Sequence, residues 1–531
     1  MQTAHPLATR AALEMLDRGG NAIDALVAAQ MMLGLAEPQM SGLGGGSLVL
    51  YWDASRRELS VLDGLAAAPG RVTASLRTAL DGSLLPRDAV VTGGRSVAVP
   101  GTLPVLAEAH RRHGRLPWAV LFEPVITRAE TGFALPEYLH RIVELDHVDP
   151  RATPDLAMYF DAQGHALPIG TPIRNPRYAQ TLRRVAARGV EGMLGDGGAE
   201  RIVAAAQHGP LPSLMTADDL RAYRPVEREA ICAPFLAYRV CTVPPPSYGG
   251  IYLLQMLQMV EDRAGGRYDF GDAAFVHLFL EAGRLARADR AKYVGDPDFT
   301  PVPTAGLVAG EYALERARTI DSNAANPAPK AGEPRGAQLA LAPAEPLAMG
   351  GTSQLTIADD EGDVAVMTTT INLGFGARLM VDGYVLNDAL INFSAAPRPG
   401  DRAANAMAPR KRPYTSMAPA IVFDASGEPF AAGGSAGGGP IPDYVSQAWI
   451  AMLANGATPA EAVEMAHYST ATARKIVVEK GTVAEHLAAP LRALGHDVAV
   501  APLLSGAGYI ERSGAGWIGA ADPRRGGNAA N

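Results

Sequence analysis

The sequence predicts an α/β fold built in layers, and three observations lead to this prediction. The first third of the 531 residues is typical of helices separated by glycines. From residue 352 onward the pattern becomes rich in strands. Helices are expected both before and after these strands, so the simplest packing is a sandwich in which helices cover sheets on both sides.

Two helices and a strand open the chain. Residues Leu7–Arg18 have the period of a helix, which ends at the C-cap pair Gly19–Gly20. Asn21 starts a second helix, which ends before Pro38. The strand Leu48–Trp52 then follows a glycine-rich turn.

The middle of the chain, from about Val105 to Arg290, alternates helical stretches with short loops. It includes Phe275–Arg290, which has the pattern of an amphipathic helix. Cys232 and Cys241 flank one apparent strand, and we expect both in the core. Two cysteines are too few for a disulfide scaffold or a four-cysteine zinc site.

A linker precedes the strand-rich region. The segment Asn323–Pro346 is rich in Ala, Pro and Gly, which predicts a flexible surface segment. We expect strands at residues 352–358, 364–371, 384–387, 419–424 and about 429–432, and helices at about 440–455 and 459–466.

Composition excludes two classes of protein. A formal charge of −8 and a pI of about 5.8 argue against a nucleic-acid-binding protein, which normally carries a basic stripe. The longest apolar run, Ala25–Ala36, is too short to span a membrane. No signal peptide precedes His5–Pro6, so we expect a cytoplasmic protein, or a periplasmic or secreted one if the N-terminus is truncated.

The first strand of the C-terminal region begins with a threonine behind two glycines, Thr352. If the polar segment Asp359–Asp363 is a turn, the flanking strands form a symmetric hairpin in which Thr352 faces Thr370. Period-two alternation then places Thr368 and Asn372 on the same face as Thr370.

This cluster of hydroxyls suits a nucleophile that is exposed when the chain is cut between Gly351 and Thr352. The freed α-amino group, with an ordinary pKa of about 8, would be a base on the nucleophile's own backbone. The alternative is an ordinary hairpin with threonines on its solvent face, because Thr is common in strands. This segment alone leaves both interpretations open.

Short motifs follow one another along nearly the whole chain. They are His5–Thr9, Gly19–Ala25, Glu37–Pro38, Ser41–Gly46, Val97–Gly101, His113–Trp118, Pro244–Gly250, Ala288–Arg290, Gly295–Phe299, Gly374–Gly376, Leu386–Asn387, Asn392–Ser394, Ser416–Pro419 and Gly437–Gly438. Each motif is weak alone. In this order and spacing they resemble the γ-glutamyltransferase family of N-terminal-nucleophile hydrolases.

The resemblance implies a precursor that cuts itself and a four-layer αββα sandwich made by the two pieces. These would be a large subunit, residues 1–351, and a small catalytic subunit, residues 352–531. Thr352 matches the processing residue and nucleophile, and Thr370 matches the threonine that supports it. The glycine pair Gly437 and Gly438 matches the oxyanion hole, where bare backbone N–H groups can approach an oxyanion.

The family's substrate-binding positions are matched in part. Asn372, Thr415 and Ser416 match residues that hold the carboxylate of the acyl group. Asn392 replaces an aspartate that accepts the α-amino group of a γ-glutamyl substrate, and Ala389 replaces its Gln or Glu partner.

A third departure concerns the substrate-gripping arginine of the family, where this chain has Leu65. Leucine cannot replace a bidentate carboxylate clamp. All three departures weaken recognition of a zwitterionic γ-glutamyl end. They resemble the acylase branch of the family, which includes cephalosporin acylases.

The implied function is a self-processing amide hydrolase or acyltransferase, as in glutathione breakdown, that needs no cofactor and no metal. Its partners would be a small amide or peptide as acyl donor, water or an amine as acceptor, and its own second fragment. One alternative is an acylase-like amidase acting on glutaryl or other acyl amides. Another is a family member without catalysis.

The sequence also contains two rival candidate sites. Gly433–Gly437 fits the G-x-S-x-G elbow of serine hydrolases, with Asp443 and His467 downstream in the required order. The glycines are better explained as the oxyanion hole. His110 and His113 have no accompanying Asp, Glu or Cys set, which argues against a metal site.

Overall fold

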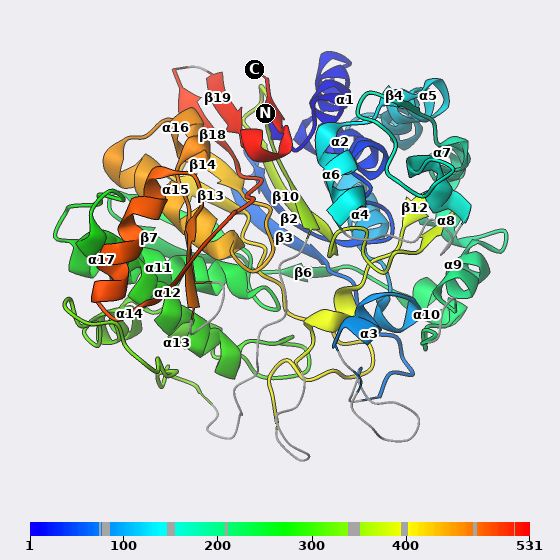
Figure 1. Cartoon of the computed structure of the whole chain (residues 1–531). Helices are drawn as coiled ribbons and strands as arrows, with labels where there is room; N and C mark the ends of the chain where they lie inside the picture. Colours follow the sequence, from blue (N-terminus) through cyan, green and yellow to red (C-terminus); the bar gives the residue numbers. More distant parts are fainter. Residues whose placement is uncertain are drawn as a thin grey trace.

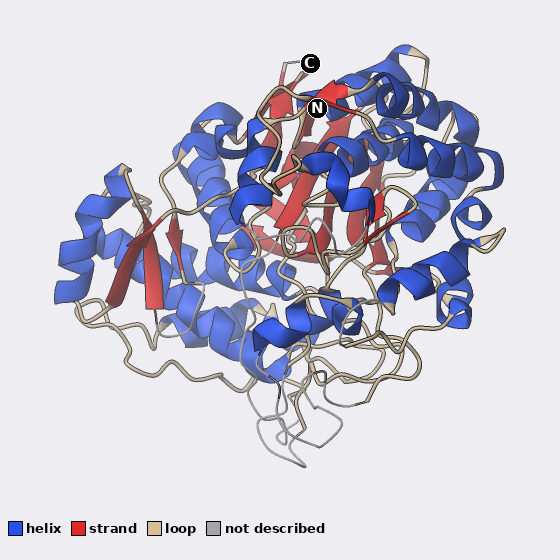
Figure 2. Ribbon diagram, turned by 45° about the vertical axis from the view of Figure 1, so that its right-hand side comes forward, coloured by secondary structure: helices blue, strands red, loops and turns tan. Residues whose placement is uncertain are grey.

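Two antiparallel sheets lie face to face, and helices cover the outer face of each sheet (Figure 1). The computed structural model describes residues 1–531 apart from 74, 75, 77–84, 86, 146–153, 208–210, 338–350, 395–401, 471–474, 515 and 531. The strands of the two large sheets lie in the middle of the molecule with helices on either side (Figure 2). The predicted four-layer αββα sandwich is therefore confirmed.

The first sheet has seven strands, and β9 and β10 lie near its middle. In spatial order its strands are β20 (Asn528–Ala529), β1 (Gln2–Thr3), β9 (Gly351–Ala358), β10 (Val364–Asn372), β2 (Gly46–Asp53), β3 (Glu58–Gly64) and β6 (Val226–Arg228). The N- and C-termini therefore lie side by side, as Figure 1 shows, and the Met1 amino group donates to the carbonyl of Ala530.

The second sheet has six strands. In spatial order they are β19 (Gly516–Ala521), β18 (Gly508–Ser513), β14 (Pro429–Gly434), β13 (Ala420–Phe423), β8 (Tyr238–Thr242) and β7 (Ile231–Phe235). The prediction of one strand between the cysteines is wrong. Cys232 lies in β7 and Cys241 opposite it in β8, where they form a disulfide.

Alternation along the strands separates the inner core from the outer ones. In β2, Leu48 and Leu50 face the second sheet, whereas Val49 and Tyr51 face the helices. In β13, Ile421 lies in the same inner cluster as Leu48. One apolar layer thus joins the sheets, and two further cores join each sheet to its helices.

The helices divide between the two outer layers. Those on the first sheet are α1 (Pro6–Asp17), α2 (Ala22–Ala36), α4 (Thr102–His113), α5 (Glu123–Thr131), α6 (Glu137–Leu145), α7 (Pro176–Arg188), α8 (Val190–Leu194), α9 (Gly198–Ala206) and α10 (Ala217–Ala222). Those on the second are α11 (Tyr248–Ala264), α12 (Ala273–Tyr293), α13 (Thr304–Leu307), α14 (Gly310–Ala317), α15 (Ile441–Asn455), α16 (Pro459–Glu464) and α17 (Ala488–Ala493). The short α3 (Arg87–Val91) lies beside a 3₁₀ turn at Gly94–Ser96.

Smaller elements complete the chain. They are the three-stranded sheet β15 (Tyr468–Ser469), β16 (Lys475–Glu479) and β17 (Asp497–Ala501), and the pairs β4 (Phe133–Ala134) with β5 (Pro172–Ile173) and β11 (Met380–Val381) with β12 (Tyr384–Val385).

Local sequence explains where the first helices begin. The Asn21 side chain accepts from the amides of Ile23 and Asp24, and the Asp24 carboxylate accepts from the Asn21 amide, so a capping box starts α2. The helix predicted at Phe275–Arg290 exists as α12, but it is not amphipathic. It is buried nearly all round because it lies between α11, α14 and the small sheet.

The predicted linker divides into two parts. Residues 323–337 form a loop with no helix or strand. Backbone contacts hold it on α12, where Asn326 donates to Glu281 and Gly332 donates to Asp289. Residues 338–350, which include the end of the predicted flexible segment, lie outside the described residues.

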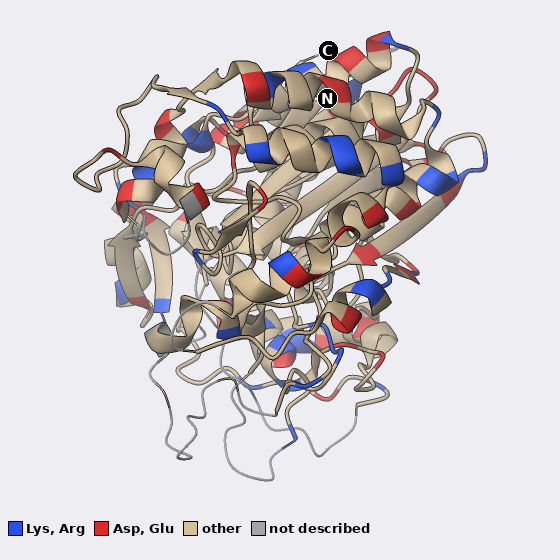
Figure 3. Ribbon diagram, turned by 90° about the vertical axis from the view of Figure 1, so that its right-hand side faces the viewer, with Lys and Arg blue, Asp and Glu red and all other residues tan. Residues whose placement is uncertain are grey.

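Charged residues lie mainly on helices and loops around the sheets (Figure 3). Among the described residues, no helix is long and apolar enough to cross a membrane.

Candidate active site

Thr352 lies at the start of β9, where the uncut chain passes through Gly351. It is 4% exposed, and it belongs to the strand face that also carries Thr356 toward the second sheet. Gly351 has almost no room for a side chain, because a Cβ there would lie 2.9 Å from Met40 Sδ. Glycine therefore lets this strand end pack closely against the loop after α2.

The hairpin follows the predicted register only up to its last residues. Val364 faces Ala358 and Thr369 faces Ser353, as predicted. A bulge then shifts the pairing, so that Asn372 rather than Thr370 forms the next pair, with Gly351. The prediction that Thr352 directly faces Thr370 in the ladder is therefore wrong.

The bulge nevertheless brings the two threonines together. Asn372 has a positive φ of 82°, a conformation that asparagine tolerates better than most residues. The Thr352 hydroxyl lies 3.5 Å from the Thr370 hydroxyl. Thr370 in turn donates to the carbonyl of Gly351 and accepts from the Asn372 amide at 2.7 Å. One hydroxyl therefore touches both the candidate nucleophile and the carbonyl before it.

The glycine pair follows β14, whose strand end lies opposite β9. Gly437 and Gly438 have positive φ values of 133° and 69°, which favour glycine. Within the described part of the chain, neither amide N–H has a hydrogen-bond acceptor. Gly438 is held from its other side, because the Ser416 hydroxyl donates to its carbonyl at 2.7 Å. The turn after β14 thus offers two unused backbone donors.

A cavity of about 40 Å³ joins these groups. It is lined by Tyr248, Arg290, Thr352, Thr370, Asn372, Asn392, Tyr414, Thr415, Ser416, Gly438 and Gly439. Every predicted site residue lines this cavity except Gly437, which directly precedes Gly438. Sequence reasoning missed Tyr248, Arg290 and Tyr414. The first two lie in motifs noted above, but nothing in the sequence indicated that they share a cavity with Thr352.

A chain of amides fixes one wall of the cavity. Asn392 donates through its side chain to Asn372, and Asn372 donates to Asp388 at 3.1 Å. Burial raises the pKa of Asp388 to about 7, and its second oxygen has no partner among the described residues. The orientation of Asn372 therefore depends on a carboxyl group behind the cavity.

The three departures from the family pattern lie in different surroundings. Asn392 lines the cavity. Leu65 packs in the inner core beside Met417, and Ala389 packs in a separate apolar cluster with Leu390. Neither Leu65 nor Ala389 lines the described cavity.

The serine-hydrolase alternative does not match the structure. Ser435 is fully buried and donates to the next backbone carbonyl. Asp443 forms an ion pair with Arg287 at 2.7 Å, whereas His467 contacts Ser505 at 2.6 Å. Burial also lowers the pKa of His467 well below its ordinary value. These three side chains form no triad.

The pair His110 and His113 also has other contacts. The His110 ring contacts the carbonyl of Leu116, and the His113 ring lies 4.5 Å from that of Tyr51. Among the described residues, no group of three or more His, Cys, Asp or Glu side chains is placed to hold a metal ion.

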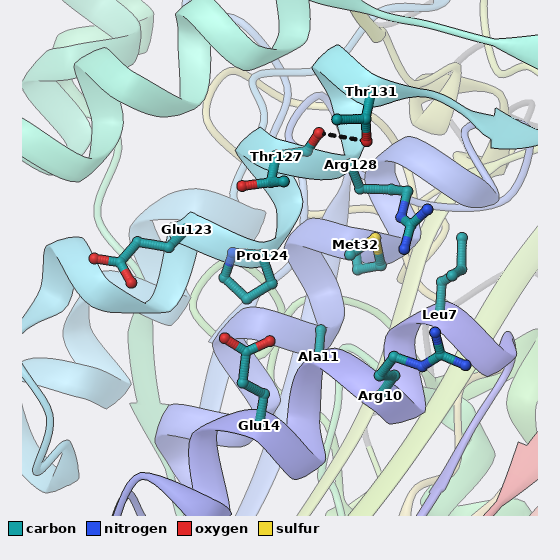
Figure 4. Close-up of a pocket in the computed structure, with 10 residues that line it drawn as sticks. All are labelled: Leu7, Arg10, Ala11, Glu14, Met32, Glu123, Pro124, Thr127, Arg128 and Thr131. Atoms are coloured by element: carbon teal, nitrogen blue, oxygen red, sulfur yellow. Dashed lines mark hydrogen bonds between the residues drawn. The ribbon is translucent and has the colours of Figure 1, made fainter.

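A larger cavity of about 410 Å³ lies on the outer helices, between α1 and α5 (Figure 4). Arg10 and Glu14 line one side, and Glu123 and Arg128 line the other. The hydroxyl of Thr131 is engaged by a backbone carbonyl of its own helix. The mixed charges of this larger cavity do not converge on a reactive group, so the small cavity at Thr352 is the better candidate.

Comparisons with known proteins agree over nearly the whole chain. A family model described as Gamma-glutamyltranspeptidase matches residues 8–531. The glutathione hydrolase proenzyme of Bacillus subtilis (strain 168) is 33% identical over 509 residues, 94% of this chain and 85% of that protein. The Acylase ACY 1 proenzyme of Pseudomonas sp. (strain SE83) is 34% identical over 513 residues, 95% of this chain and 88% of that protein.

A solved structure is similar in fold as well. The cephalosporin acylase from Bacillus halodurans has a TM-score of 0.86 and 27% sequence identity, and the match covers 100% of this chain and 95% of that one. The resemblance inferred from sequence motifs is therefore confirmed: this chain belongs to the gamma-glutamyltranspeptidase family.

Proposed function

We propose that the protein cuts itself before Thr352 and then transfers acyl groups from amides through an acyl-enzyme on that threonine. The sequence predicts an enzyme of the hydrolase and acyltransferase type, and the family match confirms that type. The observation that carries the site assignment is one cavity holding Thr352, Thr370 and the unused amide of Gly438.

The proposed self-cleavage uses Thr352, the Gly351 carbonyl, Thr370 and one water molecule. The Thr352 oxygen attacks the Gly351 carbonyl carbon, its proton passes to the departing Thr352 nitrogen, and the peptide bond becomes an ester. Water then cleaves the ester, which leaves a Gly351 carboxylate and a free Thr352 amine and hydroxyl. Thr370 donates to the Gly351 carbonyl and so polarises the bond to be broken.

In the cleaved protein the same hydroxyl attacks a substrate amide. The new α-amino group, with an ordinary pKa of about 8, takes the hydroxyl proton and returns it to the leaving amine. The amides of Gly437 and Gly438 would stabilise the oxyanion. Water or an amine then resolves the acyl-enzyme, which gives hydrolysis or transfer.

The fragments 1–351 and 352–531 would stay together, because they share both sheets. In the first sheet β9 and β10, from the second fragment, lie between β1 and β2 of the first fragment. In the second sheet β13 pairs with β8. Separation would expose the inner core and break both ladders.

Relatives are named both glutathione hydrolase and acylase, so the choice of acyl group depends on the residues of the cavity. With Asn392 in place of an acid, no carboxylate of the described residues lines the cavity to pair with an α-ammonium. An acyl group without an amine avoids that loss and can still use Thr415 and Ser416. Glutaryl amides therefore suit the cavity at least as well as γ-glutamyl amides.

We expect the purified, cleaved protein to release p-nitroaniline from glutaryl-p-nitroanilide with a kcat/KM equal to or above that for γ-glutamyl-p-nitroanilide. Simple acyl anilides without a carboxylate provide the third arm. A several-fold preference for the γ-glutamyl substrate would contradict the substrate assignment and favour glutathione breakdown. Failure to hydrolyse any of the three would contradict the acyl-transfer function itself.

The compartment is also part of the proposal. The disulfide between Cys232 and Cys241 favours an oxidising environment over the cytoplasm. It thus supports the periplasmic or secreted alternative.

A further inference from the structure

One charged side chain in the cavity has no role in the steps above. Arg290, on α12, is 3% exposed and lines the cavity together with Thr352. Buried charges are normally paired, because an unpaired ion loses its hydration. Arg290 forms no ion pair with any carboxylate of the described residues, and its Nε has no hydrogen-bond partner there.

The neighbouring acids are committed elsewhere. Asp289, next in the chain, accepts from Gln255 and Tyr312 and lies 3.4 Å from Arg316. Asp388 lies behind the amide of Asn372 and does not line the cavity. The guanidinium of Arg290 is therefore the one formally charged group on the cavity wall within the described chain.

Two tyrosines hold this guanidinium in place. Its carbon lies 4.8 Å from the ring centroid of Tyr248 and 5.1 Å from that of Tyr414. One terminal nitrogen donates to the Tyr414 hydroxyl at 3.0 Å. The two rings meet edge to face at 89°, so three separate segments fix the position of the charge. A cation held in advance loses little entropy when it binds an anion.

We propose that Arg290 binds the free carboxylate of the acyl donor. The proposal rests on the acyl transfer proposed above. It does not place the anion site at Leu65, which stands where the family has its substrate-gripping arginine. The Leu65 side chain packs in the inner core. A guanidinium gives a carboxylate charge-assisted, bidentate hydrogen bonds, whereas it repels an ammonium.

The test uses the cleaved protein and two acyl anilides that differ in one group. Glutaryl-p-nitroanilide ends in a carboxylate, and glutaramoyl-p-nitroanilide ends in a neutral carboxamide of the same length. Arg290→Met should lower kcat/KM for the glutaryl substrate by about tenfold to a hundredfold, mainly through KM, and change the neutral substrate little. Arg290→Lys should recover part of the loss, because it keeps the charge but not the fork.

Lys292→Met is the matched control, since it removes one positive charge from the same helix outside the cavity. It should leave the ratio of the two substrates unchanged. Equal losses on both substrates in Arg290→Met, or no preference for glutaryl in the wild type, would overturn the proposal and leave Arg290 a packing residue.

A binding measurement separates this proposal from the proposed reaction. Glutarate should raise the Tm of the wild type more than the neutral diamide glutaramide does, and this difference should vanish in Arg290→Met. Amide hydrolysis without a glutarate effect would refute the role of Arg290 while the reaction stands. A glutarate effect that depends on Arg290, in a protein that hydrolyses none of the amides, would keep the anion site and refute the reaction.

Discussion

Thr352→Ala should give a single uncut chain with no measurable amidase activity, whereas the wild type should give two fragments, residues 1–351 and 352–531. The hydroxyl is both the attacking group in self-cleavage and the nucleophile toward substrate. Loss of a nucleophile typically lowers turnover on the order of a millionfold. Denaturing electrophoresis and N-terminal sequencing measure the cut, and p-nitroanilide hydrolysis measures the activity.

Two variants make this prediction specific to one hydroxyl. Thr352→Ser keeps the hydroxyl and should still cut. Ser353→Ala removes the neighbouring hydroxyl, which points to the opposite face and donates to Glu37 at 2.9 Å, and it should also cut. Wild-type protein that stays whole yet hydrolyses amides would refute the mechanism, as would a new N-terminus at Ser353.

Much of the fold was predictable because its elements carry local signals. The first helix ends clearly before Gly19 and the second begins clearly at Asn21, and each lies within a residue or so of its predicted bounds. The hairpin β9–β10 follows from its polar turn. The strands β7 and β8 were missed as a pair because two short strands and a tight turn between the cysteines resemble one strand in sequence.

The candidate site was less predictable, for a physical reason. Whether a bulge forms depends on both strand pairing and the packing of distant residues, and no residue type near Thr370 indicates it. Arg290 belongs to a helix, and only the packing of α12 against the loop that carries Tyr414 brings its side chain to the cavity. Such meetings of distant segments depend on tertiary structure, which local patterns do not contain.

Gly438→Ala should lower the turnover rate of the cleaved protein by roughly a hundredfold, because loss of one oxyanion donor typically raises the barrier by about 3 kcal/mol. Gly438 has a φ of 69°, and an alanine strained there would turn its N–H away from the cavity. The loss should appear in kcat more than in KM, since the oxyanion exists only after attack. Rates are to be normalised to the cleaved fraction, which mass spectrometry measures.

The strain and the lost donor can be separated by a glycine of the same geometry. Gly456, at the C-terminus of α15, also has a φ of 69°, and a Cβ there would meet nothing within 4 Å. Gly456→Ala should therefore lower the free energy of unfolding by about 1 to 2 kcal/mol, as the same strain does in Gly438→Ala, and leave turnover unchanged.

Ser435→Ala should keep measurable activity, because its hydroxyl is buried away from the cavity. If Gly438→Ala turned over at the wild-type rate, the oxyanion would have to be stabilised elsewhere, whereas inactivity of Ser435→Ala in a folded, cleaved protein would restore the serine elbow.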